Sequence, residues 1–224
     1  MERKLEGKRV AVLVENGFEQ VELTEPVKAL KEQGAKVDII SPHDKVKGWN
    51  YTQWGDDFEV DVKLDKAVAD QYNAILLPGG VMNPDKLRMN SQAITFIKHF
   101  MESGKPVAAI CHGPWTLIET GLLSGRKVTS YPSIKTDLIN AGAKWIDQDV
   151  VTDLGIVTSR KPSDIPAFNK KMIEEIAEGV HKKRQITPLK RPWEAFSSEE
   201  RNRLNENIDT RNWDEYERMM RGEP

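Results

Sequence analysis

The sequence predicts an α/β fold in which a mostly parallel β-sheet is covered by helices on both faces. Four short runs are mostly apolar, as expected for strands that are buried on both sides, and they occur at residues 9–14, 35–40, 74–77 and 107–110. The segments between these runs carry apolar residues at spacings of three and four, which is typical of amphipathic helices. Each of these helices is expected to end at a glycine before the next strand begins.

The helices and a hairpin follow from the same patterns. Glycines end the predicted helices at Gly34, Gly104 and Gly121. Their apolar faces consist of Val27 and Leu30, then Ala93, Ile94, Ile97, Phe100 and Met101, then Leu117 and Ile118. A further helix begins near Asp164, with a face formed by Ile165, Phe168, Met172, Ile173 and Ile176. Residues 150–159 predict a β-hairpin that turns at 153–155 and borders the main sheet.

The composition restricts the class of protein. A chain of 224 residues can hold one large core with an appendage. Lys and Arg number 33 against 35 Asp and Glu, so we expect neither a nucleic-acid surface nor a membrane-binding one. The single cysteine excludes an internal disulfide framework, and the start of the chain matches no signal peptide or membrane span. We therefore expect a cytoplasmic protein.

Residues 182–224 differ in character from the rest of the chain. They contain 19 charged residues among 43 and no long apolar run, so they cannot form a core of their own. Two segments that resemble capping boxes, at 197–200 and 212–215, predict short helices. We therefore divide the chain into an α/β domain over 1–181 and a charged, partly helical C-terminal extension over 182–224. The extension is expected to pack on its own domain or on a second copy, and a separate recognition function is the alternative.

The only cysteine, Cys111, lies where a nucleophile would be placed. It directly follows the apolar run 107–110 and precedes Gly113 and Pro114, which suit a sharp turn into a helix. Such a turn lifts the side chain to the carboxyl edge of the sheet, and the helix N-terminus is expected to lower the pKa of the thiol. The alternative is a cysteine that is simply packed as a small apolar residue.

Two other segments are expected to reach the same edge of the sheet, because they also follow predicted strands. The first contains three glutamates, Glu15, Glu19 and Glu22, any of which could accept the proton of the thiol. Spacing alone does not choose among them. The second contains Gly79 and Gly80, where the backbone can approach a ligand closely and present N–H groups. It lacks the pattern of a phosphate-binding loop, so no nucleotide cofactor is expected.

Five segments in the same order resemble the ThiJ/PfpI superfamily, and most closely its PfpI-like intracellular cysteine peptidases and deglycases. The resemblance spans about residues 8–181. It is carried by GFEQVE at 17–22, LPGG at 77–80, GKPVAAICHGP at 104–114, TSYP at 129–132 and SRKPSD at 159–164.

The resemblance implies a flavodoxin-like sandwich of the class I glutamine amidotransferase type, with a set of site residues. The catalytic ones are Cys111, His112, Glu22 and Asp85, and the oxyanion- or substrate-binding ones are Gly79, Gly80 and Gly113. Among the three glutamates, the resemblance selects Glu22. Asp85 matches a glutamate that a neighbouring subunit donates in the peptidase branch, and it is one methylene shorter. Residues 49–54 are longer than their family counterpart and are expected to line the rim of the pocket.

Several activities remain open within this resemblance. The favoured one is a deglycase or glyoxalase-like hydrolase that acts on glyoxal and methylglyoxal adducts of small molecules, proteins or nucleotides in stress protection. An intracellular cysteine peptidase is the alternative, and a redox-sensing chaperone that uses Cys111 is the alternative of another class. The remaining histidines, His43, His99 and His181, suit neither an amidotransferase nor a metal site, so no metal is expected. The resemblance further implies a homodimer or a higher homo-oligomer.

Overall fold

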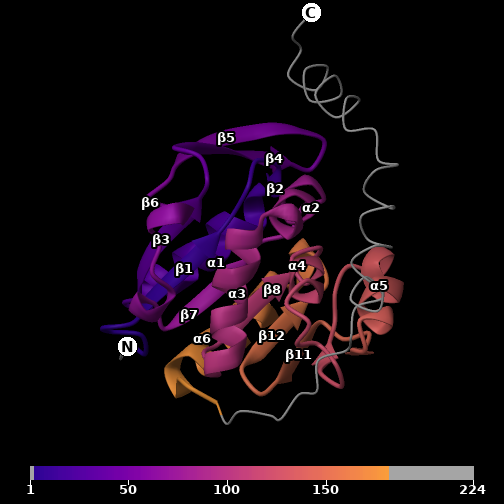
Figure 1. Cartoon of the computed structure of the whole chain (residues 1–224). Helices are drawn as coiled ribbons and strands as arrows, with labels where there is room; N and C mark the ends of the chain where they lie inside the picture. The colour runs from indigo at the N-terminus through magenta and orange to yellow at the C-terminus, as the bar shows by residue number, and fades with distance from the viewer. Residues whose placement is uncertain (1–2, 182–224) are drawn as a thin grey trace, which may run out of the picture. The chain divides into compact units, whose positions relative to one another are not determined.

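A seven-stranded sheet forms the centre of the computed structural model, which describes residues 3–181 (Figure 1). Residues 1–2 and 182–224, and with them the predicted C-terminal extension and its two helices, lie outside the described residues. The strands are ordered β11 (Val150–Asp153), β12 (Ile156–Ser159), β8 (Val107–Ile110), β7 (Ala74–Leu77), β1 (Arg9–Leu13), β3 (Lys36–Ser41) and β6 (Val62–Lys63). All neighbours run parallel except the β11–β12 hairpin. The predicted parallel sheet and its bordering hairpin are confirmed.

Side chains alternate along each strand between two apolar layers. In β1, Ala11 and Leu13 enter one layer, while Val10 and Val12 enter the other. Figure 1 shows α3 (Ser91–Ser103) across one face of the sheet, with α1 (Gln20–Glu32) and α6 (Ile165–Glu178) behind the other. Helices therefore cover both faces, as the apolar runs predict.

The boundaries of the helices have local causes. Asn90 begins α3, because its side-chain oxygen accepts the N–H groups of Gln92 and Ala93. Gly104 ends α3 in the left-handed conformation, with a φ of 73°. The remaining helical elements are α2 (Met82–Met89), α4 (Trp115–Ile118), α5 (Lys135–Asn140), η1 (Leu64–Lys66), η2 (Ala69–Gln71), η3 (Pro132–Ile134) and η4 (Pro162–Asp164). No helix in the described part of the chain has both the length and the apolar character needed to cross a membrane.

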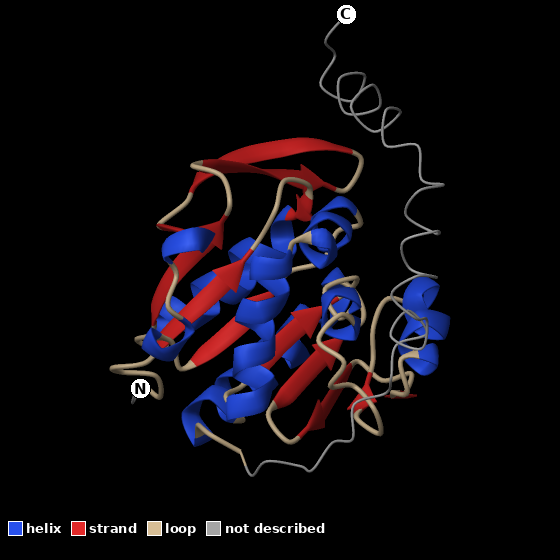
Figure 2. Cartoon of the chain, in the orientation of Figure 1, coloured by secondary structure: helices blue, strands red, loops and turns tan. Residues whose placement is uncertain are grey.

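A smaller sheet stands apart from the central one, at the end of the domain where Figure 2 draws two long red strands. It consists of β2 (Phe18–Glu19), β4 (Lys45–Asn50) and β5 (Gln53–Glu59). A separate two-stranded sheet is formed by two short strands, β9 (Lys127–Val128) and β10 (Lys144–Trp145). Trp49 and Trp54 face each other across the β4–β5 hairpin, with ring centroids 5.4 Å apart. The β4–β5 hairpin contains residues 49–54, the stretch expected at the rim of the pocket. Strand β2 pairs with β4, and the N–H of Glu19 in β2 donates to the carbonyl of Gly79 in the loop after β7.

The packing of α6 on the sheet gives a stability prediction. The ring of Phe168 is fully buried in the layer shared with α1. Phe168→Ala should lower the free energy of unfolding by about 3–5 kcal/mol, because a cavity replaces the ring. Urea unfolding measures the change, with Lys170→Ala on the exposed face of the same helix as control. A loss below about 1 kcal/mol would contradict this packing.

Candidate active site

The candidate site forms where three loops leave the carboxyl ends of adjacent strands. β8, β7 and β1 are neighbours in the sheet, and Cys111, Gly79 and Glu22 follow them. The connection after β1 leads to one side of the sheet and the connection after β7 leads to the other. The loops therefore diverge and leave a crevice at this edge, which is a common position for ligand sites in α/β folds.

The backbone of Cys111 adopts a left-handed conformation, with a φ of 62°. Such a conformation is strained for a residue with a Cβ and persists only when the surroundings hold it. The N–H of Cys111 donates to the carbonyl of Ser159 at 3.0 Å, and the carbonyl of Cys111 accepts the N–H of Tyr131 at 2.8 Å. The N–H of Gly113 closes the turn by donating to Ile110 at 2.8 Å. The predicted sharp turn is thus present.

Two glycines allow the close approach of the loops. A Cβ at Gly79 would lie 2.6 Å from Glu22 Oε2 and 2.7 Å from the Cβ of Cys111. A Cβ at Gly113 would overlap the carbonyl oxygen of Leu77. These distances are shorter than van der Waals contact, so neither position has room for a side chain.

Glu22 is fully buried beside the cysteine. Its Oε2 accepts the N–H of Gly79 at 2.9 Å. Burial raises the pKa of Glu22 to about 8, against the lowering effects of the Gly79 N–H and the Cys111 thiol. At neutral pH this carboxyl group therefore holds a proton, which it can donate.

The thiol of Cys111 does not ionise as easily as its place in the sequence suggests. Burial, and then the neighbouring Glu22, raise the pKa of Cys111, while the backbone N–H groups of Gly80 and His112 lower it. The expected helix contribution is small, because α4 is a single turn that begins four residues later. The expectation of a low pKa is therefore wrong: Cys111 and Glu22 form a coupled pair.

The imidazole of His112 lies beside the thiol. Its Nδ1 is 3.2 Å from Cys111 Sγ, and its Nε2 is 2.9 Å from the hydroxyl oxygen of Ser133. The ring stacks on Tyr131, with centroids 4.8 Å apart. Burial lowers the pKa of His112, which favours the neutral form of the ring.

The backbone N–H groups of the three predicted glycines have different hydrogen-bond acceptors. The N–H of Gly79 is used by Glu22, and that of Gly113 by Ile110. Of the three predicted glycines, Gly80 is the one whose N–H is directed at the Cys111 sulfur, together with the N–H of His112, and the N–H of Gly80 also interacts with Glu22. Gly79 and Gly113 instead make room for the site.

The other two glutamates of the loop after β1 have partners away from the thiol, and the contribution of Asp85 from a neighbouring subunit stays a prediction. Asp85 is exposed on α2, and no hydrogen bond or ion pair joins it to His112 within the described chain. Glu15 pairs with His43 at 2.8 Å. Glu19 accepts the N–H of Tyr51, and partial burial raises the pKa of Glu19. Glu22 is thus the glutamate that the fold brings to Cys111.

Two residues of the site were not predicted from the sequence. Asn83 is fully buried, donates to the carbonyls of Pro78 and Gly79, and accepts the N–H of Glu15. It joins the loops after β1 and β7. Ser133 faces His112, and its place directly after the TSYP motif was the available signal.

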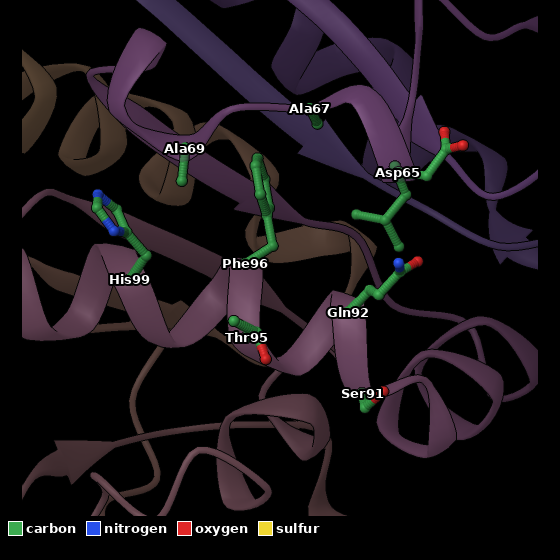
Figure 3. Close-up of a pocket in the computed structure, with 9 residues that line it drawn as sticks. Asp65, Ala67, Ala69, Ser91, Gln92, Thr95, Phe96 and His99 are labelled. Atoms are coloured by element: carbon green, nitrogen blue, oxygen red, sulfur yellow. The ribbon is translucent and has the colours of Figure 1, made fainter.

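Other hollows and clusters lie outside this site. A hollow of about 350 Å³ lies between α3 and the η1–η2 segment, and none of the predicted site residues lines it. Figure 3 shows Phe96 and His99 among its lining residues. Glu175, Glu178 and His181 form a group in the described chain that could hold a metal ion. Glu178 is exposed, and the pairing of His181 Nε2 with Glu175 Oε2 at 3.1 Å accounts for the group without an ion.

Comparison with known proteins agrees with the fold and identifies the family. The family model described as the DJ-1/PfpI family matches residues 8–175. The chain is 42% identical over 166 residues to "Deglycase PH1704" of Pyrococcus horikoshii, an alignment that covers 74% of this chain and 98% of that protein. It is 45% identical over 168 residues to "Putative cysteine protease YraA" of Bacillus subtilis, an alignment that covers 75% of this chain and 97% of that protein.

Solved structures show the same architecture. A two-domain protein from Anabaena variabilis, with dj-1/thij/pfpi-like and ferritin-like domains, matches with a TM-score of 0.72 and 34% identity. The match covers 80% of this chain and 52% of that one, so the chain spans about half of the two-domain protein. Drosophila melanogaster DJ-1beta matches with a TM-score of 0.69 and 29% identity, over 76% of this chain and 90% of that one. The chain belongs to the DJ-1/PfpI family.

Proposed function

We propose that the protein is a cysteine-dependent hydrolase that removes glyoxal- and methylglyoxal-derived groups from thiols and amines. One observation carries the proposal: the Cys111 thiol sits on a left-handed turn between the fully buried carboxyl group of Glu22 and two backbone N–H groups. That arrangement supplies a nucleophile, a proton donor and an oxyanion site. Relatives named deglycases, at about 42% identity, support this choice among the activities of the family.

The proposed reaction balances without a cofactor. The Cys111 thiol gives its proton to Nδ1 of His112, and the sulfur attacks the carbinol carbon of the adduct. A carbon–sulfur bond forms as the bond from that carbon to the thiol or amine breaks, and this leaving group takes a proton from Glu22. Glu22, now a carboxylate, carries a proton from that carbon to the neighbouring one, and the hydroxyl proton passes to the neighbouring carbonyl oxygen, which converts the hemithioacetal into a thioester. Water hydrolyses the thioester to lactate or glycolate, and the N–H groups of Gly80 and His112 stabilise the oxyanion. The carbonyl group of the substrate is reduced as its neighbour is oxidised.

Peptide hydrolysis is the second candidate. The contact of His112 Nδ1 with Cys111 Sγ at 3.2 Å favours it, as does the relative named a putative cysteine protease. A peptidase also needs an imidazolium that protonates the leaving amine, and a carboxylate usually stabilises this cation. Within one chain His112 meets the hydroxyl of Ser133 instead, so we rank this activity second.

The test is release of lactate from methylglyoxal-treated N-acetylcysteine and N-acetylarginine by freshly reduced protein. Cys111→Ala should lower kcat by at least about 10³-fold, because no other thiol exists in the chain. Glu22→Gln should also remove most of the turnover, because an amide cannot carry the proton.

Ser103→Ala, at the far end of α3, serves as the matched control and should keep wild-type turnover. A casein-derived peptide is assayed in parallel. Cleavage of the peptide without release of lactate would reject the deglycase and favour the peptidase.

The buried carboxyl group of Glu22 gives a pH prediction for stability. Its pKa of about 8 in the folded state lies above its ordinary value of 4.5, so the folded protein binds more protons between these values. Stability should therefore fall as pH rises from about 4.5 to 8, and Glu22→Gln should remove up to about 5 kcal/mol of that loss. Urea unfolding at pH 5 and pH 9 measures it.

Glu25→Gln, on the exposed face of the same helix, is the control for charge removal. Equal pH dependence in the wild type and in Glu22→Gln would show that Glu22 ionises normally in the fold.

A further inference from the structure

Both ring nitrogens of His112 have partners within a single chain. Nδ1 lies 3.2 Å from Cys111 Sγ and Nε2 lies 2.9 Å from Ser133 Oγ. One face of the ring stacks on Tyr131, and the residue is only 8% exposed. Rotation of the ring would break both polar contacts at once, so Ser133 opposes any loss of the contact between Nδ1 and the thiol.

The segment that carries Ser133 is tied to the backbone of the nucleophile. Ser133 lies in η3, and Tyr131, just before this turn, donates its N–H to the carbonyl of Cys111 at 2.8 Å. A buried neighbour, Ile134, anchors the other end of the turn in the core. The hydroxyl group of Ser133 is therefore positioned by the same elements that position Cys111.

The hydroxyl group has a chemical consequence that a carboxylate would not have. A hydroxyl can donate to an imidazole nitrogen or accept from it, so it holds either neutral tautomer of the ring. It carries no charge, and it stabilises an imidazolium less than a carboxylate does. Among residues 3–181 of the same chain, the titratable groups beside the ring are the Cys111 thiol and the stacked Tyr131 phenol, with Glu22 coupled to the thiol.

We propose that Ser133 is a positioning residue that holds the His112 ring with Nδ1 against the Cys111 sulfur. This inference deepens the proposed function and rests on it for its effect on turnover. In the one proton transfer that involves the ring, the S–H bond breaks and an Nδ1–H bond forms. The ring then donates Nε2–H to Ser133 Oγ, whose own proton turns away. Because the hydroxyl stabilises this cation weakly, the ring returns the proton readily.

The first test is an NMR titration of the His112 ring in the full-length protein with Ser133→Ala, Ser133→Thr and Ser133→Asp. Ser133 is exposed on its outer side, so these changes leave the core intact. Ser133→Asp should raise the pKa of His112 by at least one unit, because a carboxylate replaces the hydroxyl. Ser133→Thr should keep the wild-type titration, and Thr136→Ala on the following turn is the control. An unchanged titration in Ser133→Asp would overturn the proposal.

The second readout is turnover of the adduct. Ser133→Ala should lower kcat about 10-fold with little change in KM, and Ser133→Thr should restore it. Equal loss in the alanine and threonine variants, or a loss confined to KM, would also overturn the positioning role. The NMR titration needs no activity, so absence of lactate release in the wild type would reject the proposed function while the titration still decides the role of Ser133.

Discussion

The close contact of the Gly79 backbone with Glu22 and Cys111 is the constraint on which the rest of the site depends. The α-carbon of Gly79 leaves room for a hydrogen only, and its N–H is the donor to the buried carboxyl group. This contact joins the loops after β1, β7 and β8 at one point. Asn83 reinforces it by linking the same loop to Glu15. The strained turn at Cys111 persists because these neighbours hold it.

The same contact determines the electrostatics of the site. A carboxyl group that is removed from water keeps its proton to a higher pH, and a thiol beside it is harder to ionise. The two groups then titrate as a pair, and after the first proton is lost they share the one that remains. When the negative charge lies on sulfur, the N–H groups of Gly80 and His112 stabilise it. Burial of Glu22 thus costs stability and supplies a proton donor at neutral pH.

Much of the fold could be predicted from the sequence, because buried parallel strands and amphipathic helices have clear periodicity. The strands that include Val10, Ile75 and Ala108 lie where their apolar runs indicate. The hairpin over β4 and β5 was not predicted, because its strands are polar and partly exposed. Local pattern alone could not separate Glu22 from its two neighbours, and the family resemblance made that choice. The lowered pKa expected for Cys111 was wrong because burial and Glu22 are tertiary effects. The contacts of Ser133 and Asn83 could not be predicted either, because they join segments that only the folded chain brings together.

The central claim is that Cys111 and Glu22 titrate as a coupled pair, which loses its first proton near pH 8. The most direct measurement is the pH dependence of alkylation of the protein by iodoacetamide, since the chain has a single cysteine and every modification reports on Cys111. The account predicts an inflection near pH 8 in the wild type that is absent from Glu22→Gln. Identical profiles in the two proteins would show that the groups titrate independently, and would contradict the account.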